Sequence, residues 1–265
     1  MAEERSITVR TLDESGVAIT GGTSGVGLAA ALQLADAGVR RLALMGRNEE
    51  RGFAARQTVL DAYPEAQVEF VAVDASDPVD ATRAVNDAHT RIGTIDVLVN
   101  STNSSFTPAL LHDTPIEQIA AMLTQQALPP LLMTRAILPA MREQRGGAII
   151  NIASGAAKVA TPGETVLGAA MAAIVMFTRA TAMEAKRDGV RVNVLTPSLI
   201  PGTPSGERVL EGGFSAKLFA KAIQQAHLGV TDVDDLASLI VYLASPAAAR
   251  LTGQAISVNG GISAA

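Results

Sequence analysis

The chain has 265 residues and a net charge of −5, with 48% hydrophobic and 18% charged residues and no cysteine. This length and composition suit one α/β domain with a large core and argue against disorder. The acidic balance without a basic run argues against nucleic-acid binding, and no apolar run is long enough to predict a membrane span. The missing cysteines exclude disulfides and thiolate metal sites and favour a cytoplasmic location. His89, His112 and His227 lack metal-ligand spacing, so we expect no metal.

Short apolar runs and helical patterns alternate along most of the chain. Residues 1–15 are polar and form a predicted N-terminal extension, followed by one domain over 16–265. We expect strands over 17–19, 41–45, 67–73, 96–100, 148–153, 190–195 and 255–258. We expect helices over 28–38, 49–62, 78–92, 115–143, 163–187, 207–227 and 232–244. Strict alternation predicts an α/β fold with a doubly wound parallel sheet, whose ligands bind at the carboxyl ends of the strands.

The first strand runs into a glycine-rich turn, Thr20–Gly27, which opens a helix. Glycines let the backbone approach a phosphate closely, and the unpaired N–H groups of a helix N-terminus favour an anion. The segment therefore predicts a binding site for a dinucleotide pyrophosphate. The expected contacts are Gly21, Thr23, Ser24, Gly25, Val26 and Gly27.

Six segments in order resemble the signatures of the classical short-chain dehydrogenase/reductase family, over residues 16–261. They are Thr20–Gly27 (TGxxxGxG), 73–77 around Asp74, 96–100, 151–154, 191–197 (RVNxxxP), and 252–254 with 258–261. The resemblance implies a Rossmann-type fold, NAD(P)(H) as cofactor and an adenine contact at Asp74. It implies further cofactor contacts at Ala75, Asn100, Pro197, Ile200 and Thr203.

The end of the second strand favours NADP(H) over NAD(H). A carboxylate there would bind a free ribose 2′-hydroxyl and repel a 2′-phosphate. The chain has Arg47 and Asn48 instead, and a guanidinium pairs well with phosphate. We therefore expect both residues to contact the cofactor.

The catalytic positions depart from the family pattern of Asn, Ser, Tyr and Lys. Ser154 is retained, but the tyrosine position thirteen residues later is Leu167 and the lysine position is Met171. The asparagine position is Gln126. No Tyr-x-x-x-Lys pair occurs anywhere in the chain, so no change of register restores the motif.

Other residues near the vacated positions are candidate proton donors. Lys158 lies four residues after Ser154, on a loop that borders the substrate in family folds, and the chain has few lysines. Glu164 and His112 are further candidates. Of these candidates, Lys158 is the one that we would test first.

Three functions fit this pattern. The first is an oxidoreductase that transfers a hydride to or from a small organic substrate by a non-standard proton path. The second is a catalytically silent subunit, because family members assemble through the long helices predicted here over 115–143 and 163–187. A silent subunit would pair with an active paralogue in a hetero-oligomer, whereas in general we expect a homotetramer or a homodimer. The third is a cofactor-holding cyclase or lyase without redox chemistry. In each case we expect residues 200–226 to form a substrate lid.

Overall fold

The computed structural model describes residues 6–211 and 213–265, and its centre is one seven-stranded sheet. All strand pairs are parallel, and the order is β3-β2-β1-β4-β5-β6-β7. The strands are β1 (Gly16–Thr20), β2 (Arg41–Gly46), β3 (Gln67–Ala72), β4 (Val97–Asn100), β5 (Gly147–Ile152), β6 (Val190–Pro197) and β7 (Ala255–Val258). The chain order reverses between β1 and β4. The predicted single-domain, doubly wound Rossmann-type fold is confirmed.

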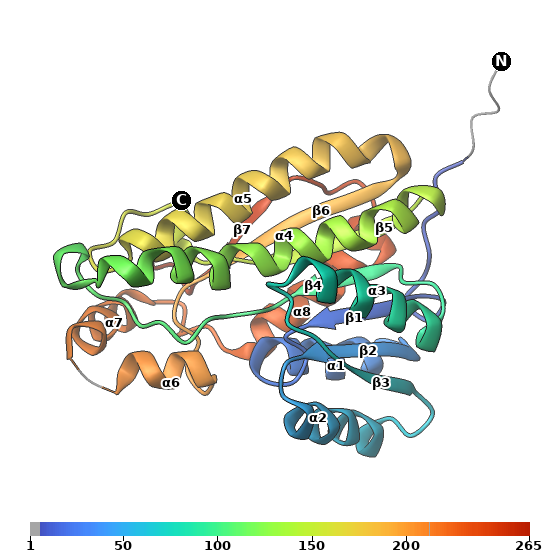
Figure 1. The fold of residues 1–265 in the computed structure, drawn as a ribbon, viewed down its shortest axis with the longest axis horizontal. Coiled ribbons are helices and arrows are strands. Elements are labelled where there is room, and N and C mark those ends of the chain that lie inside the picture. The colour runs from blue at the N-terminus through green and yellow to red at the C-terminus, as the bar shows by residue number, and fades with distance from the viewer. Residues whose placement is uncertain (1–5, 212) are drawn as a thin grey trace.

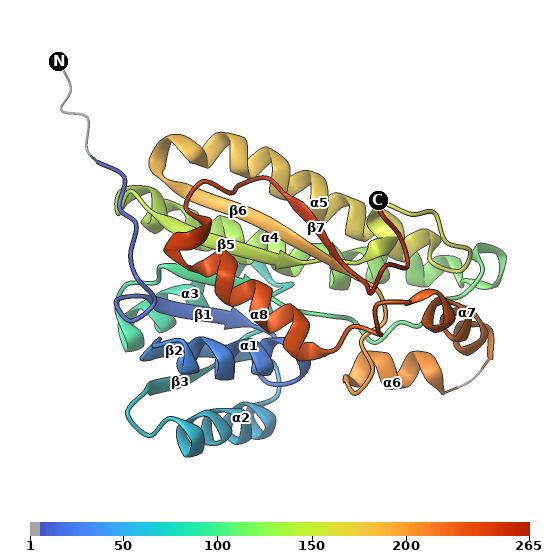
Figure 2. The same ribbon diagram turned by 180° about the vertical axis from the view of Figure 1, so that it is seen from behind.

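Helices cover both faces of the sheet, as Figures 1 and 2 show from opposite sides. One face carries α3, α4 and α5, and the other carries α1, α2 and α8. The helices are α1 (Gly25–Asp36), α2 (Glu49–Ala62), α3 (Pro78–Ile92), α4 (Ile119–Glu143), α5 (Thr165–Ala185), α6 (Pro204–Leu210), α7 (Gly213–Gln225) and α8 (Val233–Ala244). Helices α6 and α7 lie at one end of the molecule, away from the two layers (Figure 1).

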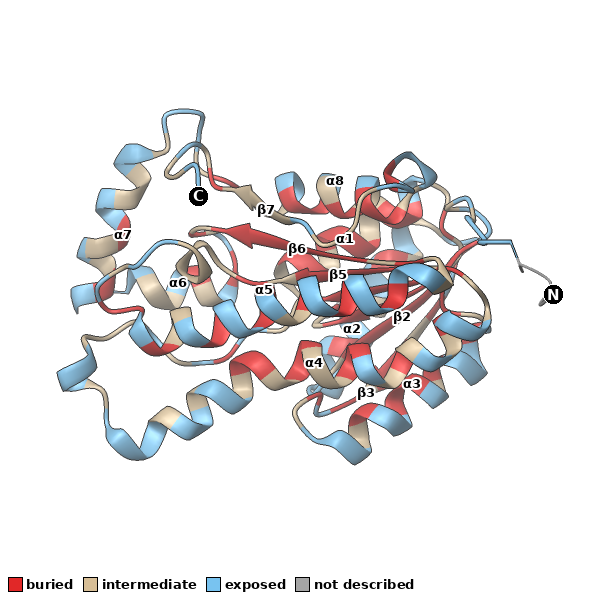
Figure 3. Ribbon diagram, turned by 90° about the horizontal axis from the view of Figure 1, so that it is seen from above, coloured by how far each residue is buried: buried red, intermediate tan, exposed pale blue. Residues whose placement is uncertain are grey.

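The central strands are buried on both faces, because helices cover each side of a parallel sheet. Every residue of β1 and β4 is buried, which explains why these strands read as continuous apolar runs in the sequence. Figure 3 shows buried strands between helices whose outer faces are exposed. Since helices cover both faces, a ligand can reach the sheet at the carboxyl ends of its strands.

Two predicted helices differ from the structure. The segment 115–143 begins with a short 3₁₀ turn at Ile116–Gln118, after an earlier one at Leu111–Asp113, and α4 starts only at Ile119. The segment 207–227 is two helices: α6 starts early at Pro204 and ends at Leu210, and α7 begins at Gly213, whose φ is +73°. The Thr203 hydroxyl accepts a hydrogen bond from the Gly206 N–H at 3.0 Å, and a proline at the first helical position loses no bond.

The N-terminal segment packs on the domain in its described part, residues 6–15. Thr8 N–H donates to the carbonyl of Arg145 at 2.8 Å, and Leu12 packs against the core. Residues 1–5 of the predicted extension lie outside the described residues. The segment lies at the amino ends of the strands, where Gly16 N–H donates to the Asp96 carboxylate at 2.9 Å.

One helical stretch, Thr165–Asp188, is long and apolar enough by length and composition to cross a membrane, with a mean hydropathy of 1.6. Its inward face packs in the core through residues such as Ile174 and Ala182. Its outward face exposes Met176 and Met183, 62% and 61% exposed. The apolar composition of this stretch is therefore explained by a helix whose inner face packs in the core and whose outer face is also apolar.

Candidate active site

A cavity of about 670 Å³ lies at the carboxyl ends of the strands. Its wall includes the ends of β1, β2, β5 and β6, the N-terminus of α1 and the first turns of α5. Helices α6 and α7 form another side of it through Arg208, Val209, Leu218, Phe219 and Lys221. One continuous space therefore joins the glycine turn to the helices of the 200–226 segment.

The turn after β1 packs so closely at two glycine positions that no side chain would fit there. A Cβ on Gly21 would lie 2.3 Å from the carbonyl oxygen of Ser101, and the φ of Gly21 is +76°. A Cβ on Gly27 would lie 2.3 Å from the carbonyl oxygen of Gly21. Gly21 lines the cavity, whereas Gly27 packs α1 against the turn and does not line it. The two positions thus bring the turn and the start of α1 together at the cavity wall.

The N-terminus of α1 opens into the cavity. Ser24 is the N-cap residue, but its side chain makes no capping hydrogen bond within the described structure. Thr23, Ser24, Gly25 and Val26 all line the cavity. The first-turn N–H groups of a helix lack intrahelical partners, so this geometry suits a phosphate. The hydroxyl oxygen of Thr20, buried in the same wall, also lacks a partner among the described residues.

Asp74 and Arg47 lie together where a nucleotide's adenosine end would be held. The Asp74 carboxylate accepts bonds from the Ser76 hydroxyl at 2.5 Å and the Ser76 N–H at 3.1 Å. The Ser76 hydroxyl lowers the pKa of Asp74, and the charge of Arg47 lowers it further. Arg47 and Arg51 are both exposed and line the cavity. Ala75 lines it beside Asp74.

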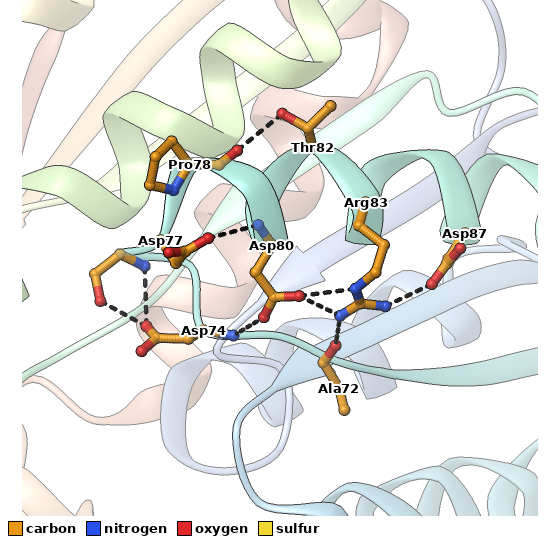
Figure 4. A network of polar contacts seen from close by, with 9 residues as sticks. Ala72, Asp74, Asp77, Pro78, Asp80, Thr82, Arg83 and Asp87 are labelled. Carbon is orange, nitrogen blue, oxygen red and sulfur yellow. Dashed lines mark hydrogen bonds and ion pairs between the residues drawn. The ribbon is translucent and has the colours of Figure 1, made fainter.

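A network of polar contacts fixes the backbone of Asp74 (Figure 4). Asp74 N–H donates to the Asp80 carboxylate at 2.7 Å. Arg83 in turn donates to Asp80 at 2.8 Å, to Asp87 at 2.6 Å and to the carbonyl of Ala72 at 2.6 Å. The end of β3 is therefore tied to the first turns of α3, which positions Asp74 at the rim.

Two predicted cofactor contacts have other partners in the structure. The side chain of Asn48 caps α2 by accepting from Arg51 N–H at 2.8 Å, and Asn48 does not line the cavity. The buried Asn100 amide donates to Asn151 at 2.9 Å, and Asn151 donates to the Thr178 hydroxyl at 2.9 Å. Helix capping and a buried amide chain between β4, β5 and α5 use these two side chains, and contact of Asn48 and Asn100 with the cofactor stays a prediction.

The remaining predicted cofactor residues come from the end of β6 and the loop after it. Pro197, Ile200 and Thr203 line the cavity. A Cβ on Gly25 would lie 3.4 Å from the methyl group of Thr203, so the glycine turn touches the start of α6. The loop after β6 therefore faces the N-terminus of α1 across the cavity.

The catalytic positions converge on the same cavity. Ser154, Leu167 and Met171 all line it. The Ser154 hydroxyl accepts from Ala156 N–H at 3.2 Å and so caps the short turn after β5. A Cβ on Gly168 would lie 2.8 Å from the carbonyl oxygen of Ala156. This close approach holds the Ser154 turn against α5, one residue from Leu167.

Lys158 and Gln126 do not line this cavity. The Lys158 ammonium donates to the Ser257 hydroxyl at 2.5 Å and to the carbonyl of Ala255 at 3.3 Å. Burial lowers the pKa of Lys158, and Arg179 lowers it further. The loop of Lys158 lines the cavity through Ala156 and Val159, but the Lys158 side chain binds β7, and its role as a proton donor stays a prediction. The buried Gln126 amide donates to the Ser104 hydroxyl at 2.7 Å.

Sequence reasoning gave too little weight to Glu164 and missed Arg51. Glu164 is only 9% exposed and lines the cavity. Burial raises the pKa of its carboxyl, against an opposing hydrogen bond with Thr161. The available signal was spacing in the sequence, because Glu164 lies three residues before Leu167 and Arg51 four residues after Arg47. His112 is an exposed residue that lies 3.6 Å from Asp113 and does not line the cavity.

A family model described as enoyl-(acyl carrier protein) reductase matches residues 21–263. The chain belongs to the short-chain dehydrogenase/reductase family. A relative, 2-(S)-hydroxypropyl-CoM dehydrogenase 3 of Xanthobacter autotrophicus, is 30% identical over 250 residues, 94% of this chain and 96% of that protein.

Solved structures of this family share the fold over nearly the whole chain. Levodione reductase matches with a TM-score of 0.89 and 28% identity, covering 97% of this chain and 100% of that one. An NADPH-bound short chain oxidoreductase from Pseudomonas aeruginosa, which contains an atypical catalytic center, matches with a TM-score of 0.86 and 26% identity. That match covers 96% of this chain and 99% of that one.

The residues of this short-chain dehydrogenase/reductase fit a nicotinamide dinucleotide. The glycine turn and the uncapped N-terminus of α1 suit the pyrophosphate. Asp74 and Arg47 would hold the adenosine end, and Pro197, Ile200 and Thr203 would contact the cofactor from the opposite side.

Proposed function

We propose that this protein is an NADP(H)-dependent oxidoreductase that transfers a hydride to or from a small organic substrate without the family's tyrosine and lysine. The observation that carries the proposal is the single cavity, which joins the glycine turn to Ser154, Leu167 and Met171. When bound, the nicotinamide would supply or accept the hydride. The protein's own contribution is to hold the substrate beside it, which lowers the barrier by removing translational and rotational freedom.

The preference for NADP(H) rests on two arginines. Arg47 and Arg51 line the same part of the cavity, and neither has a carboxylate within ion-pair distance in the described structure. Both are therefore available to a 2′-phosphate, with which guanidinium groups form charge-assisted bonds.

Leu167 and Met171 give the reaction space an apolar wall. Both residues lie on the face of α5 that faces the cavity, and Met171 is 6% exposed. An apolar wall excludes water and strengthens the electrostatic interactions within the site. The Ser154 hydroxyl, which accepts a backbone bond, keeps its own hydrogen free to bind an oxygen of the substrate.

A titration with NADPH and NADH, followed by an oxidation assay, tests this function. The fluorescence of the reduced nicotinamide would report binding of each nucleotide. Absorbance would then follow NADPH with 2,3-butanedione, ethyl acetoacetate and cyclohex-2-enone, which represent diketones, keto esters and enones. We expect NADPH to bind more tightly than NADH and at least one probe to be reduced. The proposal would be refuted if neither NADPH nor NADH binds. Product formed without any change in NADPH absorbance would favour a non-redox cyclase or lyase instead.

The second candidate is a silent subunit, and the outer face of α4 and α5 favours it. Leu123, Met176 and Met183 are exposed there, and the two helices lie side by side on one face of the molecule (Figure 1). We propose that this face binds either a second copy, as a homodimer or homotetramer, or an active paralogue in the cytoplasm. Size measurement of the pure protein, alone and with neighbouring gene products, distinguishes these. A homo-oligomer that reduces a probe unaided would rule out the silent role.

A further inference from the structure

Glu164 stands at the start of α5, on the same face as the vacated catalytic positions. Residues three and seven positions apart share a helix face, so Glu164 lies in line with Leu167 and Met171. All three line the cavity that Ser154 also lines. The carboxyl is therefore one turn from the position where the family has its tyrosine.

Glu164 is buried, and tertiary contacts hold the loop that leads to it. The preceding residue, Gly163, has a φ of +86°, and a Cβ there would lie 2.3 Å from the Phe214 ring of α7. Ala109 N–H donates to the Gly163 carbonyl at 2.9 Å. The loop that enters α5 is thus held between the 103–110 loop and α7, and the buried ring of Phe219 lines the same cavity.

Two carboxyl groups line the cavity among the described residues, and their environments differ. Asp74 accepts bonds from Ser76, which lower its pKa, whereas burial raises the pKa of Glu164. Burial therefore favours the protonated form of Glu164, whereas the bonds from Ser76 favour the charged form of Asp74. The other charged side chains in the cavity wall are Arg47, Arg51, Arg208 and Lys221.

We propose that Glu164 donates the proton that the tyrosine donates in the family pattern, to the substrate atom that gains negative charge as the hydride arrives. For a ketone, a C–H bond forms from the hydride and the carbonyl π pair passes to oxygen. An O–H bond then forms from the Glu164 proton, which leaves a carboxylate that solvent reprotonates. The net change is NADPH, a proton and a ketone to NADP⁺ and an alcohol. This inference rests on the proposed oxidoreductase function.

Other groups near the site are poorer donors. The Ser154 hydroxyl is a very weak acid, and the Gln126 amide, which donates to Ser104, does not itself line the cavity. Lys158 binds β7, and His112 does not line the cavity. Glu164 alone among these combines an acidic proton with a place in the wall beside Leu167.

The protonation state of Glu164 is measurable without a substrate. Carboxyl-¹³C glutamate labelling with NMR would follow each carboxyl against pH, and the resonance missing from E164Q is that of Glu164. We expect it to titrate above the ordinary range for glutamate in the NADPH-bound protein. F214A should expose the carboxyl and move its titration to lower pH. Titration of Glu164 within or below the ordinary range would overturn the proposal, whether or not any probe is reduced.

The stability of E164Q gives a second readout with a definite sign. A raised pKa in the folded state means that ionisation opposes folding. The free energy of unfolding of the wild type should therefore fall relative to that of E164Q as pH rises from the unfolded pKa through the folded one. E143Q, which removes an exposed glutamate of α4, should show no such divergence.

Kinetics with the probes named above separate the two proposals. E164Q should bind NADPH as the wild type does but reduce a ketone probe about 10²–10⁴-fold more slowly. The wild-type rate should fall at high pH, whereas the rate of E164Q should not. E164D should recover part of the rate that E164Q loses. An E164Q that keeps the wild-type rate and pH profile would refute the role of Glu164 and leave the oxidoreductase function intact. Failure of the wild type to bind either nucleotide would instead refute the proposed function.

Discussion

Replacing Arg47 with alanine tests whether the end of β2 selects the 2′-phosphate of NADPH. Arg47 is exposed and lines the cavity near Asp74, so the truncation removes a positive charge without disturbing the core. We expect the affinity for NADPH to fall about 10- to 100-fold, while the affinity for NADH stays unchanged, because NADH lacks the phosphate.

The magnitude follows from the exposure of the group. Hydrogen bonds to charged groups contribute about 1.5–3 kcal/mol. Arg47 is exposed in the free protein, so solvent screening places the effect toward the lower part of that range. Arg51, in the first turn of α2, also lines the cavity and retains part of the attraction. The double variant R47A/R51A should therefore lose more than R47A alone.

Fluorescence titration of NADPH and NADH at two ionic strengths would measure these affinities for the wild type, R47A, R51A and the double variant. Added salt should reduce the NADPH preference of the wild type more than that of the double variant, because screening weakens exposed charge pairs. R250A removes an exposed arginine outside the cavity and serves as the control. Equal loss of affinity for both nucleotides, or no loss for either, would refute the assignment of Arg47.

Three further substitutions test the site. In G27V, a side chain would stand where even a Cβ would lie 2.3 Å from the carbonyl oxygen of Gly21. This variant should lose NADPH binding, and its free energy of unfolding should fall by about 1–3 kcal/mol. Tight NADPH binding by G27V would contradict the packing. N100L removes the donor to the Asn151 amide, so urea unfolding should show a loss of about 1–3 kcal/mol, and an unchanged midpoint would argue against the buried chain. K158M should leave the affinity for NADPH and the rate of probe reduction unchanged but lower the thermal midpoint, because its bond to β7 is lost; a slower reaction at unchanged stability would restore Lys158 as a catalytic candidate.

The sequence determined the sheet and the glycine turn because local patterns encode both. Buried parallel strands read as apolar runs, and the alternation of strands and helices specifies the crossovers. The glycines of Thr20–Gly27 are needed where no Cβ fits, so the turn is visible in the residues themselves. The same reasoning placed Arg47 and Asp74 at strand ends, and the structure has both in the cavity wall.

Side-chain direction at the site was decided only by the tertiary structure. Lys158 follows Ser154 by four residues, yet its ammonium binds β7, which lies about a hundred residues further along the chain. Asn100 ends an apolar strand, as a ligand-binding residue would, yet its side-chain amide donates to the side chain of Asn151. Neither partner is visible in local sequence, because both bonds join segments that meet only when the sheet forms.

The sequence by itself determined that the family's tyrosine and lysine positions hold Leu167 and Met171, since that needs only a count along one helix. It did not distinguish Glu164 from other loop residues. The residue before it, Gly163, is held by Phe214 from α7 and by the bond from Ala109, which come from distant parts of the chain. The environment of an ionisable group depends on everything packed around it, so its chemistry is set by the folded structure.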